Sequence, residues 1–260
     1  MRLIFIRHGD PDYKNDSLTE KGNREVSLLT ERVCKWKNIT AFYTSPLGRA
    51  QNTIAPSLTK LGRTQITKDW LQEFHYSVKD PFTGENRLMW DLKPSYFCSK
   101  PDFFNKDKWY KTKFIKSGNG KNYYDMVCNG IDEILSEYGY KRKGLYYKVS
   151  NQRTLGSLNP EIKKYQLISE KHQDENYTLV FTCHLGVMFA IISHLINISP
   201  MQLWQGFYVP PTSVTIINSE EVENETAWFR VDRIGDTQHL TKGGEPLSSS
   251  GYFTDLLNEV

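Results

Sequence analysis

Short runs of apolar residues alternate along the chain with segments in which apolar residues recur every three or four positions. The runs are typical of strands buried on both faces, and the recurring positions are typical of helices that pack one face on such strands. This alternation predicts an α/β fold with a mostly parallel central sheet between helical layers, a three-layer α/β/α arrangement. The predicted strands are Leu3–Ile6, Ile39–Ser45, Gln65–Glu73, Tyr177–Cys183, Ser213–Ser219 and Ala227–Ile234.

Helix boundaries are marked by residues that suit a first or last turn. A helix is predicted after Ser17 or Thr19, because either hydroxyl can cap its free N–H groups. Ser45 with Pro46 predicts a second start, since proline at the first helical position loses no hydrogen bond. Gly62 ends this second helix. Two further helices are predicted over Asn122–Tyr138 and Leu185–Ile198.

Residues 74–176 are too long for a plain connection within a compact domain. We therefore expect a single domain over 1–260, with an insertion of short helices and loops at 74–176 that covers the strand ends. From Lys100 to Lys148, lysine and arginine outnumber aspartate and glutamate. This excess fits a solvated face, or a lid whose lysines and aromatic side chains receive an anionic, partly planar substrate. The candidates for stacking on such a substrate are Trp90, Trp109 and Tyr110.

The composition is that of an ordinary globular protein. Of the 260 residues, 38% are hydrophobic and 24% are charged, and the formal net charge of +3 does not indicate a nucleic-acid partner. No apolar run approaches the ~20 residues that a membrane span needs, and no signal-peptide pattern is found. The four cysteines lie far apart without a CxxC pair, which argues against a metal or redox site and favours a reduced, cytoplasmic setting.

Cationic and imidazole side chains stand at the ends of the predicted strands. Arg7, His8 and Gly9 follow the first strand, His184 follows the fourth, and Arg49 falls in the first turn of the helix after the second. In open α/β sheets, ligands bind at the carboxyl ends of the strands, and a glycine there allows close approach of the backbone. Guanidinium groups match phosphate oxygens, and a neutral imidazole can attack phosphorus without first losing a proton. The pattern predicts a phosphate site with a histidine nucleophile.

Five short segments carry a resemblance to a known family. In chain order they are Arg7-His8-Gly9, Leu18–Gly22, Thr44–Thr53, Leu71-Gln72-Glu73 and Thr182–Gly186. They resemble the motifs of the histidine phosphatase superfamily (phosphoglycerate mutase-like proteins, branch 1), and the resemblance covers residues 1–75 and 177–240. It implies the phosphoglycerate mutase-like fold and catalysis through phosphohistidine, without a metal ion or another cofactor. It assigns the nucleophile to His8 and hydrogen bonding of the transition state to His184.

The leaving alcohol needs a proton, which a carboxyl group with a raised pKa can supply. Glu73 matches the acid of the mutase-like branch, where a Leu-x-Glu triplet stands at this point of the chain. The other branch places its acid directly after the second histidine, where this chain has Leu185. The predicted catalytic residues are therefore His8, His184 and Glu73. The predicted phosphate-binding residues are Arg7, Arg49, His184 and Asn15.

This chain departs from the family pattern in two places. Many relatives have a small polar residue or a glutamate after the first motif, then serine or threonine, and an asparagine a few places on. Here Asp10-Pro11-Asp12-Tyr13 occupies that stretch, and Asp10 would repel phosphate unless a cation screens it. Asn15 is offset from the register of the family's asparagine. Mutases also carry a basic stretch after their glutamate, whereas Phe74-His75-Tyr76 follows Glu73 here.

The resulting hypothesis is a metal-independent phosphomonoester phosphatase with a small phosphorylated substrate, and with neither nucleic acid nor membrane as a partner. Two alternatives stay open. A phosphoglycerate mutase would transfer the phosphoryl group between hydroxyls, and the missing basic stretch counts against it. A non-catalytic binding module would use the pocket to hold a phosphorylated partner, and Asp10 is the residue that favours it.

Overall fold

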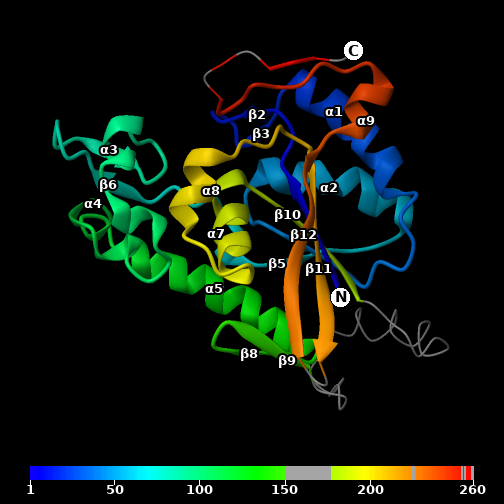
Figure 1. Cartoon of the computed structure of the whole chain (residues 1–260). Coiled ribbons are helices and arrows are strands. Elements are labelled where there is room, and N and C mark those ends of the chain that lie inside the picture. Colours follow the sequence, from blue (N-terminus) through cyan, green and yellow to red (C-terminus); the bar gives the residue numbers. More distant parts are fainter. Residues whose placement is uncertain (150–176, 224–225, 253, 255, 259–260) are drawn as a thin grey trace.

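The computed structural model describes residues 1–149, 177–223, 226–252, 254 and 256–258. Its centre is an eight-stranded sheet in the order β5-β4-β10-β1-β11-β12-β9-β8 (Figure 1). The strands β5, β4, β10 and β1 pair in parallel, and the remaining pairs are antiparallel. In sheet order the strands are β5 (Ile66–Thr67), β4 (Ala41–Thr44), β10 (Thr178–Cys183), β1 (Arg2–Arg7), β11 (Val214–Glu223), β12 (Thr226–Asp236), β9 (Tyr146–Val149) and β8 (Tyr140–Lys143).

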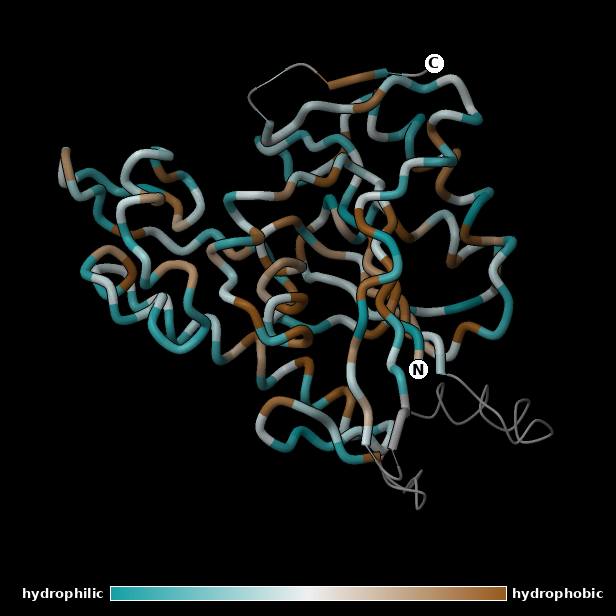
Figure 2. Tube along the Cα trace, in the orientation of Figure 1, coloured by the Kyte–Doolittle hydropathy of each residue, from teal (hydrophilic) through white to brown (hydrophobic). Residues whose placement is uncertain are grey.

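Helices cover both faces of this sheet, as the alternation of elements predicted. Ile4 and Ile6 of β1 point toward one face and pack with α1 and α2, whereas Leu3 and Phe5 point toward the other and pack with α5, α7 and α8. Figure 1 shows the two helical layers on either side of the sheet, and Figure 2 shows its central strands as the most hydrophobic part. The helices are α1 (Glu20–Val33), α2 (Gly48–Leu61), α3 (Pro94–Cys98), α4 (Lys113–Lys116), α5 (Gly120–Glu137), α7 (Leu185–Leu195), α8 (Pro200–Gly206) and α9 (Gln238–Gly243).

The first predicted helix start is confirmed and the second is wrong. The Thr19 hydroxyl accepts the N–H of Gly22 at 3.0 Å and caps α1. Helix α2 does not start at Ser45-Pro46 but at Gly48, and its N-cap residue makes no side-chain cap bond. The Ser45 hydroxyl accepts the N–H of Leu47 at 3.2 Å and contacts an imidazole described below, and the N–H of Gly48 in the first turn is satisfied by the Asp16 carboxylate at 2.6 Å.

The third predicted strand is much shorter than expected. Only Ile66–Thr67 pair with β4, and a turn of 3-10 helix, η1 (Asp69–Leu71), carries the chain onward. Glu73 therefore follows a turn rather than a strand. Two short antiparallel strand pairs lie outside the main sheet. One pair is β2 (Pro11–Asp12) with β3 (Ser17–Leu18), and the other is β6 (Ser77–Lys79) with β7 (Asn86–Leu88).

The described part of the predicted insertion, residues 74–149, builds a layer of the fold in addition to lying near the strand ends. Helix α5 covers one face of the sheet, and the hairpin β8–β9 extends the sheet beyond β12. The 3-10 helices η2 (Pro101–Phe104) and η3 (Trp109–Lys111) form a lobe with α3, α4 and β6–β7, seen at the left of Figure 1. Trp109 is 1% exposed within this lobe, so it cannot stack on a substrate as expected. Residues 150–176 of the insertion lie outside the described residues.

The segment after α9 is held against the amino-terminal part of the chain. The carboxylate of Glu245 accepts two hydrogen bonds from Arg24, at 2.9 and 3.1 Å, and one from Lys21 at 3.0 Å. In Figure 1 this segment passes over β2, β3 and α1. None of the described helices has the length and apolar character needed to cross a membrane.

Candidate active site

Three neighbouring parallel strands end side by side, and polar residues follow each of them. The N–H of His8 donates to the carbonyl of Cys183 at 2.9 Å, and the N–H of Ser45 donates to the carbonyl of Thr182 at 3.0 Å. These bonds continue the β1–β10 and β10–β4 pairings by one residue. They bring His8, Ser45 and His184 to one edge of the sheet, where the His8 and His184 rings lie 5.0 Å apart between centroids.

His8 is buried and held in one tautomer. Its Nδ1 lies 2.8 Å from the carbonyl oxygen of Gly9, which can only accept, so Nδ1 carries the proton and Nε2 carries the lone pair. Burial lowers the pKa of His8 well below its usual value, and the positive charges of Arg7 and Arg49 act in the same direction. The ring is therefore neutral near pH 7, with Nε2 as a nucleophile.

His184 is fully buried beside it. Its Nε2 lies 2.8 Å from the Ser45 hydroxyl, and its Nδ1 has no hydrogen-bond partner among the described residues. Burial lowers the pKa of His184 well below its usual value, reinforced by His8 and the two arginines. When Nε2 accepts the Ser45 hydroxyl proton, Nδ1 of the neutral ring carries the ring proton and can donate it to a ligand.

Two buried arginines complete the edge. Arg7 donates to the carbonyls of Val209 and Ser250 at 2.7 and 2.8 Å, and Arg49 donates to the carboxylate of Asp16 at 2.7 Å. The Nε of each arginine is buried and has no partner within the described part of the chain. Buried polar atoms in native proteins are nearly always paired. Three unpaired nitrogens on three site residues therefore point to an absent acceptor with several oxygen atoms, which is the chemistry of a phosphoryl group.

Glu73 reaches this edge from the end of η1. Its Oε1 accepts the N–H groups of Phe74, Gly186 and Val187 at 2.7, 3.0 and 3.3 Å. Burial raises the pKa of Glu73, against the opposing effect of these N–H groups and the two arginines. Glu73 thus occupies two of the first N–H groups of α7, and its carboxyl group lies close enough to Arg7 and Arg49 to be affected by their charges, as a group that can keep its proton.

Asp10 and Asn15 are placed differently from the other predicted residues. Asp10 accepts hydrogen bonds from the hydroxyls of Thr19, at 2.6 Å, and Ser248, so hydroxyl groups satisfy its carboxylate. Asn15 is exposed, and its amide donates to Asp12 at 2.6 Å. The structure brings His8, His184, Glu73 and the two arginines together, but it does not bring Asn15 to them.

Sequence reasoning missed some residues that shape the site. Ser45 was taken only as a helix cap, although its place directly after a predicted strand was a usable signal. Tyr208 lies with its ring 5.5 Å from the Arg7 guanidinium, and Asp16 binds Arg49. Both stand in loops without apolar periodicity, so no local pattern marked them.

Gly9, directly after His8, has a role in the packing of α1 against β1. Gly9 does not adopt a positive φ angle. A Cβ atom there would lie 3.2 Å from the Gly22 carbonyl oxygen and 3.3 Å from Val26. The missing side chain lets α1 approach the end of β1.

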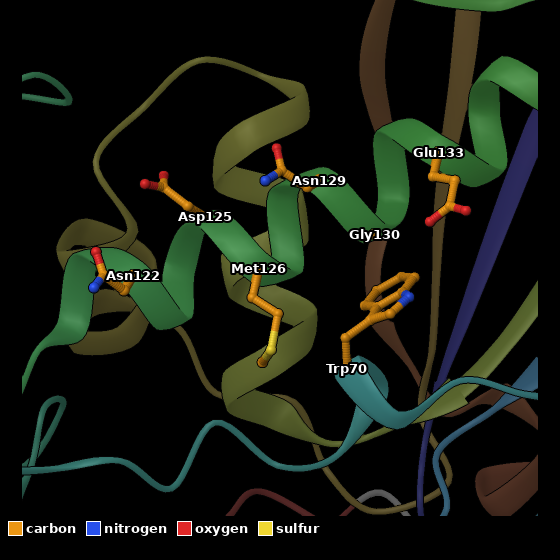
Figure 3. A pocket seen from close by; sticks show the side chains of 7 residues that line it. All are labelled: Trp70, Asn122, Asp125, Met126, Asn129, Gly130 and Glu133. Carbon is orange, nitrogen blue, oxygen red and sulfur yellow. The ribbon is translucent and has the colours of Figure 1, made fainter.

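A separate cavity of about 540 Å³ lies on the outer face of α5. Figure 3 shows Trp70 facing Gly130 of this helix, with polar side chains along its length. No strand-end residue lines it. The lining residues are Trp70, Asn122, Asp125, Met126, Asn129, Gly130 and Glu133. In the described ranges, no group of three or more His, Cys, Asp or Glu side chains is arranged to hold a metal ion.

Comparison with known proteins identifies the family that the amino-terminal part of the chain resembles. The family model described as histidine phosphatase superfamily (branch 1) matches residues 3–86, which confirms the resemblance drawn from the amino-terminal motifs. A comparison with curated protein sequences gives no match.

Two solved structures are similar over nearly their whole length. A mycobacterial glucosyl-3-phosphoglycerate phosphatase is 14% identical with a TM-score of 0.55, and the match covers 90% of this chain and 98% of that one. A phosphoserine phosphatase from Entamoeba histolytica, in complex with 3-phosphoglyceric acid, is 17% identical with a TM-score of 0.54, and the match covers 92% and 98%. At these identities the likeness shows the fold, a mixed sheet flanked by helices, and confirms the predicted α/β class. The sheet is mixed rather than mostly parallel as predicted, because the pairing of β1 with β11 and the pairs beyond it are antiparallel.

Proposed function

Because residues 3–86 match the family model of the histidine phosphatase superfamily (branch 1), we propose that the chain is a phosphomonoester phosphatase that works through phosphohistidine. The observation that supports this most is the set of three unpaired buried nitrogens, Arg7 Nε, Arg49 Nε and His184 Nδ1, around the neutral ring of His8. A phosphoryl group bound there would accept from all three. The similar structures carry the names of phosphatases for small phosphorylated compounds, so we propose a substrate of that kind.

In the first step, the lone pair on His8 Nε2 attacks phosphorus and forms an N–P bond. The bond between phosphorus and the ester oxygen breaks, and protonated Glu73 gives its proton to that oxygen, so that a neutral alcohol leaves. The two arginines and His184 stabilise the charge on the equatorial oxygens during transfer.

In the second step, a water molecule attacks phosphorus and the N–P bond breaks. The Glu73 carboxylate takes the proton of this water and returns to its acid form. Inorganic phosphate leaves and His8 is neutral again, so neither step needs a metal ion or another cofactor.

Hydrolysis of p-nitrophenyl phosphate by wild type and His8→Ala tests the proposal. We expect the substitution to abolish turnover, and we expect acid-labile phosphate on the wild-type protein only, after a brief exposure to ³²P-labelled substrate. His194→Asn is the matched control, because His194 bonds Asp132 and lies outside the site. Full activity in His8→Ala would refute the mechanism. Labelling without phosphate release would instead favour a phosphotransferase, and no labelling at all would favour a binding module.

A further inference from the structure

The loop between β2 and β3 is fixed by its own side chains. The Asp12 carboxylate accepts the backbone N–H groups of Lys14 and Asn15 at 3.1 and 3.3 Å, as well as the Asn15 amide at 2.6 Å. Asp16, in the left-handed region at φ 45°, then turns the chain back. This is the structural use of Asn15, the residue that the sequence suggested as a phosphate ligand.

The same loop is attached to the phosphate-binding helix. Asp16 accepts the N–H of Gly48 at 2.6 Å and a guanidinium N–H of Arg49 at 2.7 Å, both in the first turn of α2. A side chain on this loop is therefore positioned relative to the site before any substrate arrives. Such preorganisation reduces the entropy lost on binding.

Tyr13 is the side chain that this loop presents. Its ring centroid lies 5.5 Å from the Arg49 guanidinium carbon, and its side chain is 64% exposed. A large aromatic ring in open solvent, next to a buried arginine of the phosphate site, is a surface on which a second ring can stack.

The loop around Tyr13 carries Asp10, Asp12 and Asp16 against one lysine, Lys14, so its net charge does not favour an additional anion. Arg49 already pairs with Asp16, and the two terminal nitrogens of Arg7 donate to protein carbonyls. The segment after Glu73 is Phe74-His75-Tyr76, without lysine or arginine. A leaving group that carries its own carboxylate would therefore meet more carboxylates than cations on this loop.

We propose that Tyr13 determines specificity by stacking on an uncharged aromatic leaving group, so that the preferred substrates are phosphate monoesters of phenols. This rests on the proposed function, because the phosphoryl group must occupy the site formed by Arg7, Arg49 and His184. The phosphoryl transfer itself is unchanged: His8 takes the group, and the phenol leaves with the Glu73 proton. Tyr13 touches the leaving group and takes no part in proton transfer.

The test compares kcat/KM for 2-naphthyl phosphate, phenyl phosphate, glycerol 2-phosphate and 3-phosphoglycerate in wild type, Tyr13→Ala and Tyr13→Phe. Aromatic pairs of this kind correspond to a roughly two- to tenfold effect. We expect kcat/KM of Tyr13→Ala to be lower than that of wild type by about this factor for the two aryl esters, with the larger loss for 2-naphthyl phosphate. For glycerol 2-phosphate we expect kcat/KM to be unchanged. Tyr13→Phe keeps the ring, so we expect the ratios of kcat/KM between the four esters to stay as in wild type. Phe82→Ala, at a residue that is 63% exposed on the β6–β7 turn, is the matched control.

Two results would overturn the inference while the proposed function stands. One is an equal loss with all four esters in Tyr13→Ala, which would mean that Tyr13 only supports Arg49. The other is a wild-type enzyme that hydrolyses 3-phosphoglycerate faster than either aryl ester in a His8-dependent manner. If wild type hydrolyses neither these four esters nor p-nitrophenyl phosphate, the proposed function fails and the inference fails with it.

Discussion

Glu73 and Gly186 are joined by a hydrogen bond of 3.0 Å in which a carboxylate oxygen accepts the N–H of the second residue of α7. The two residues are 113 positions apart in the sequence. The bond holds the carboxyl group of Glu73, the proposed acid, against a residue that lies two positions after His184. It also explains why the N–H groups of Gly186 and Val187 are not free to bind a phosphate. A Cβ at position 186 would lie 2.7 Å from the same carboxylate oxygen, so the glycine is needed for this arrangement.

Glu73→Gln keeps the shape of this contact but removes the acid. We expect kcat/KM, which reports the first step, to fall by about 10²–10⁴ with alkyl phosphates, because a poor leaving group needs a proton. With p-nitrophenyl phosphate kcat/KM falls much less, because its leaving group departs as the anion. Steady-state kinetics with both esters measures the two losses, and Glu133→Gln on the exposed face of α5 is the control. Equal losses of kcat/KM with both esters would contradict the assignment of Glu73 as acid.

The pH profile of kcat/KM follows from two pKa shifts in opposite directions. Burial and the arginines lower the pKa of His8 below 6.5, and burial raises the pKa of Glu73 above 4.5. Nucleophilic His8 must be deprotonated and Glu73 must be protonated, so both shifts enlarge the fraction of enzyme in the reactive form. We expect the basic limb of the alkyl-phosphate profile to disappear in Glu73→Gln while the acidic limb stays. A basic limb that persists in this variant would assign it to another group.

Arg49→Lys is not a conservative change at this site. Lysine keeps the charge but loses the planar fork and the Nε that is unpaired in the structure. We expect kcat/KM to fall by about 10²–10³, as for other lost donors to a transition state, and inhibition by inorganic phosphate to weaken. Arg230→Lys, at an exposed arginine of β12, controls for the substitution itself. Wild-type kinetics in Arg49→Lys would mean that the charge alone is sufficient.

Glu25 of α1 makes stability depend on pH. Burial raises its pKa from 4.5 to about 7, while its Oε2 accepts the N–H of Asp10 at 2.9 Å. The folded state holds this proton more tightly than the unfolded state, so the contribution of Glu25 is complete below pH 4.5 and is lost as the pH rises to 7. The loss is of the order of 3 kcal/mol.

Glu25→Gln should remove this dependence, because an amide can accept the same N–H without ionising. Urea unfolding between pH 5 and pH 8 measures the difference in free energy between variant and wild type, which we expect to shift in favour of the variant as the pH rises. Glu20→Gln, at an exposed position of the same helix, should show no such trend. A constant difference over this range would refute the role of Glu25.

Gly130→Ala should destabilise the protein even though alanine is the better helix former. A Cβ at this position would lie 2.4–2.5 Å from three atoms of the Trp70 indole, in the contact that Figure 3 shows. Overpacking costs roughly 1–3 kcal/mol, which exceeds the gain of up to about 1 kcal/mol in helix propensity. Gly206→Ala in α8 is the matched control, since a Cβ there meets no atom within 4 Å. Thermal unfolding of the two variants should give a lower Tm only for Gly130→Ala.

The sequence was most informative where chemistry coincided with the ends of buried strands. His8 and His184 could be expected side by side because two apolar runs predicted parallel strands, and the carboxyl ends of such strands share an edge. Arg49 followed from its place in the first turn of the next helix. Glu73 needed the family motif, because the predicted strand before it is mostly a turn in the structure.

The remaining features depend on contacts that no local pattern encodes. Asn15 lies in a loop whose polar groups bond one another, so its neighbour in sequence, Asp12, competes with any ligand for its amide. The carbonyl of Ser250 reaches Arg7 across 243 positions, and neither residue predicts the other. The Ser45 hydroxyl could cap a helix or hydrogen-bond an imidazole. Its bond to His184 follows only from the pairing of β4 with β10 in the folded sheet.

The adjacency of β1 and β10 also has a consequence for how the protein reaches its native state. Arg2 pairs with Thr178, so these two neighbouring strands of the parallel half close a ring of more than 170 residues. Closing so long a ring carries a large entropic penalty and makes topologies of this kind slow to form. Hydrolytic activity regained after dilution from denaturant should therefore lag behind the recovery of helical circular dichroism, because the helices form locally while the two imidazoles meet only when this ring closes.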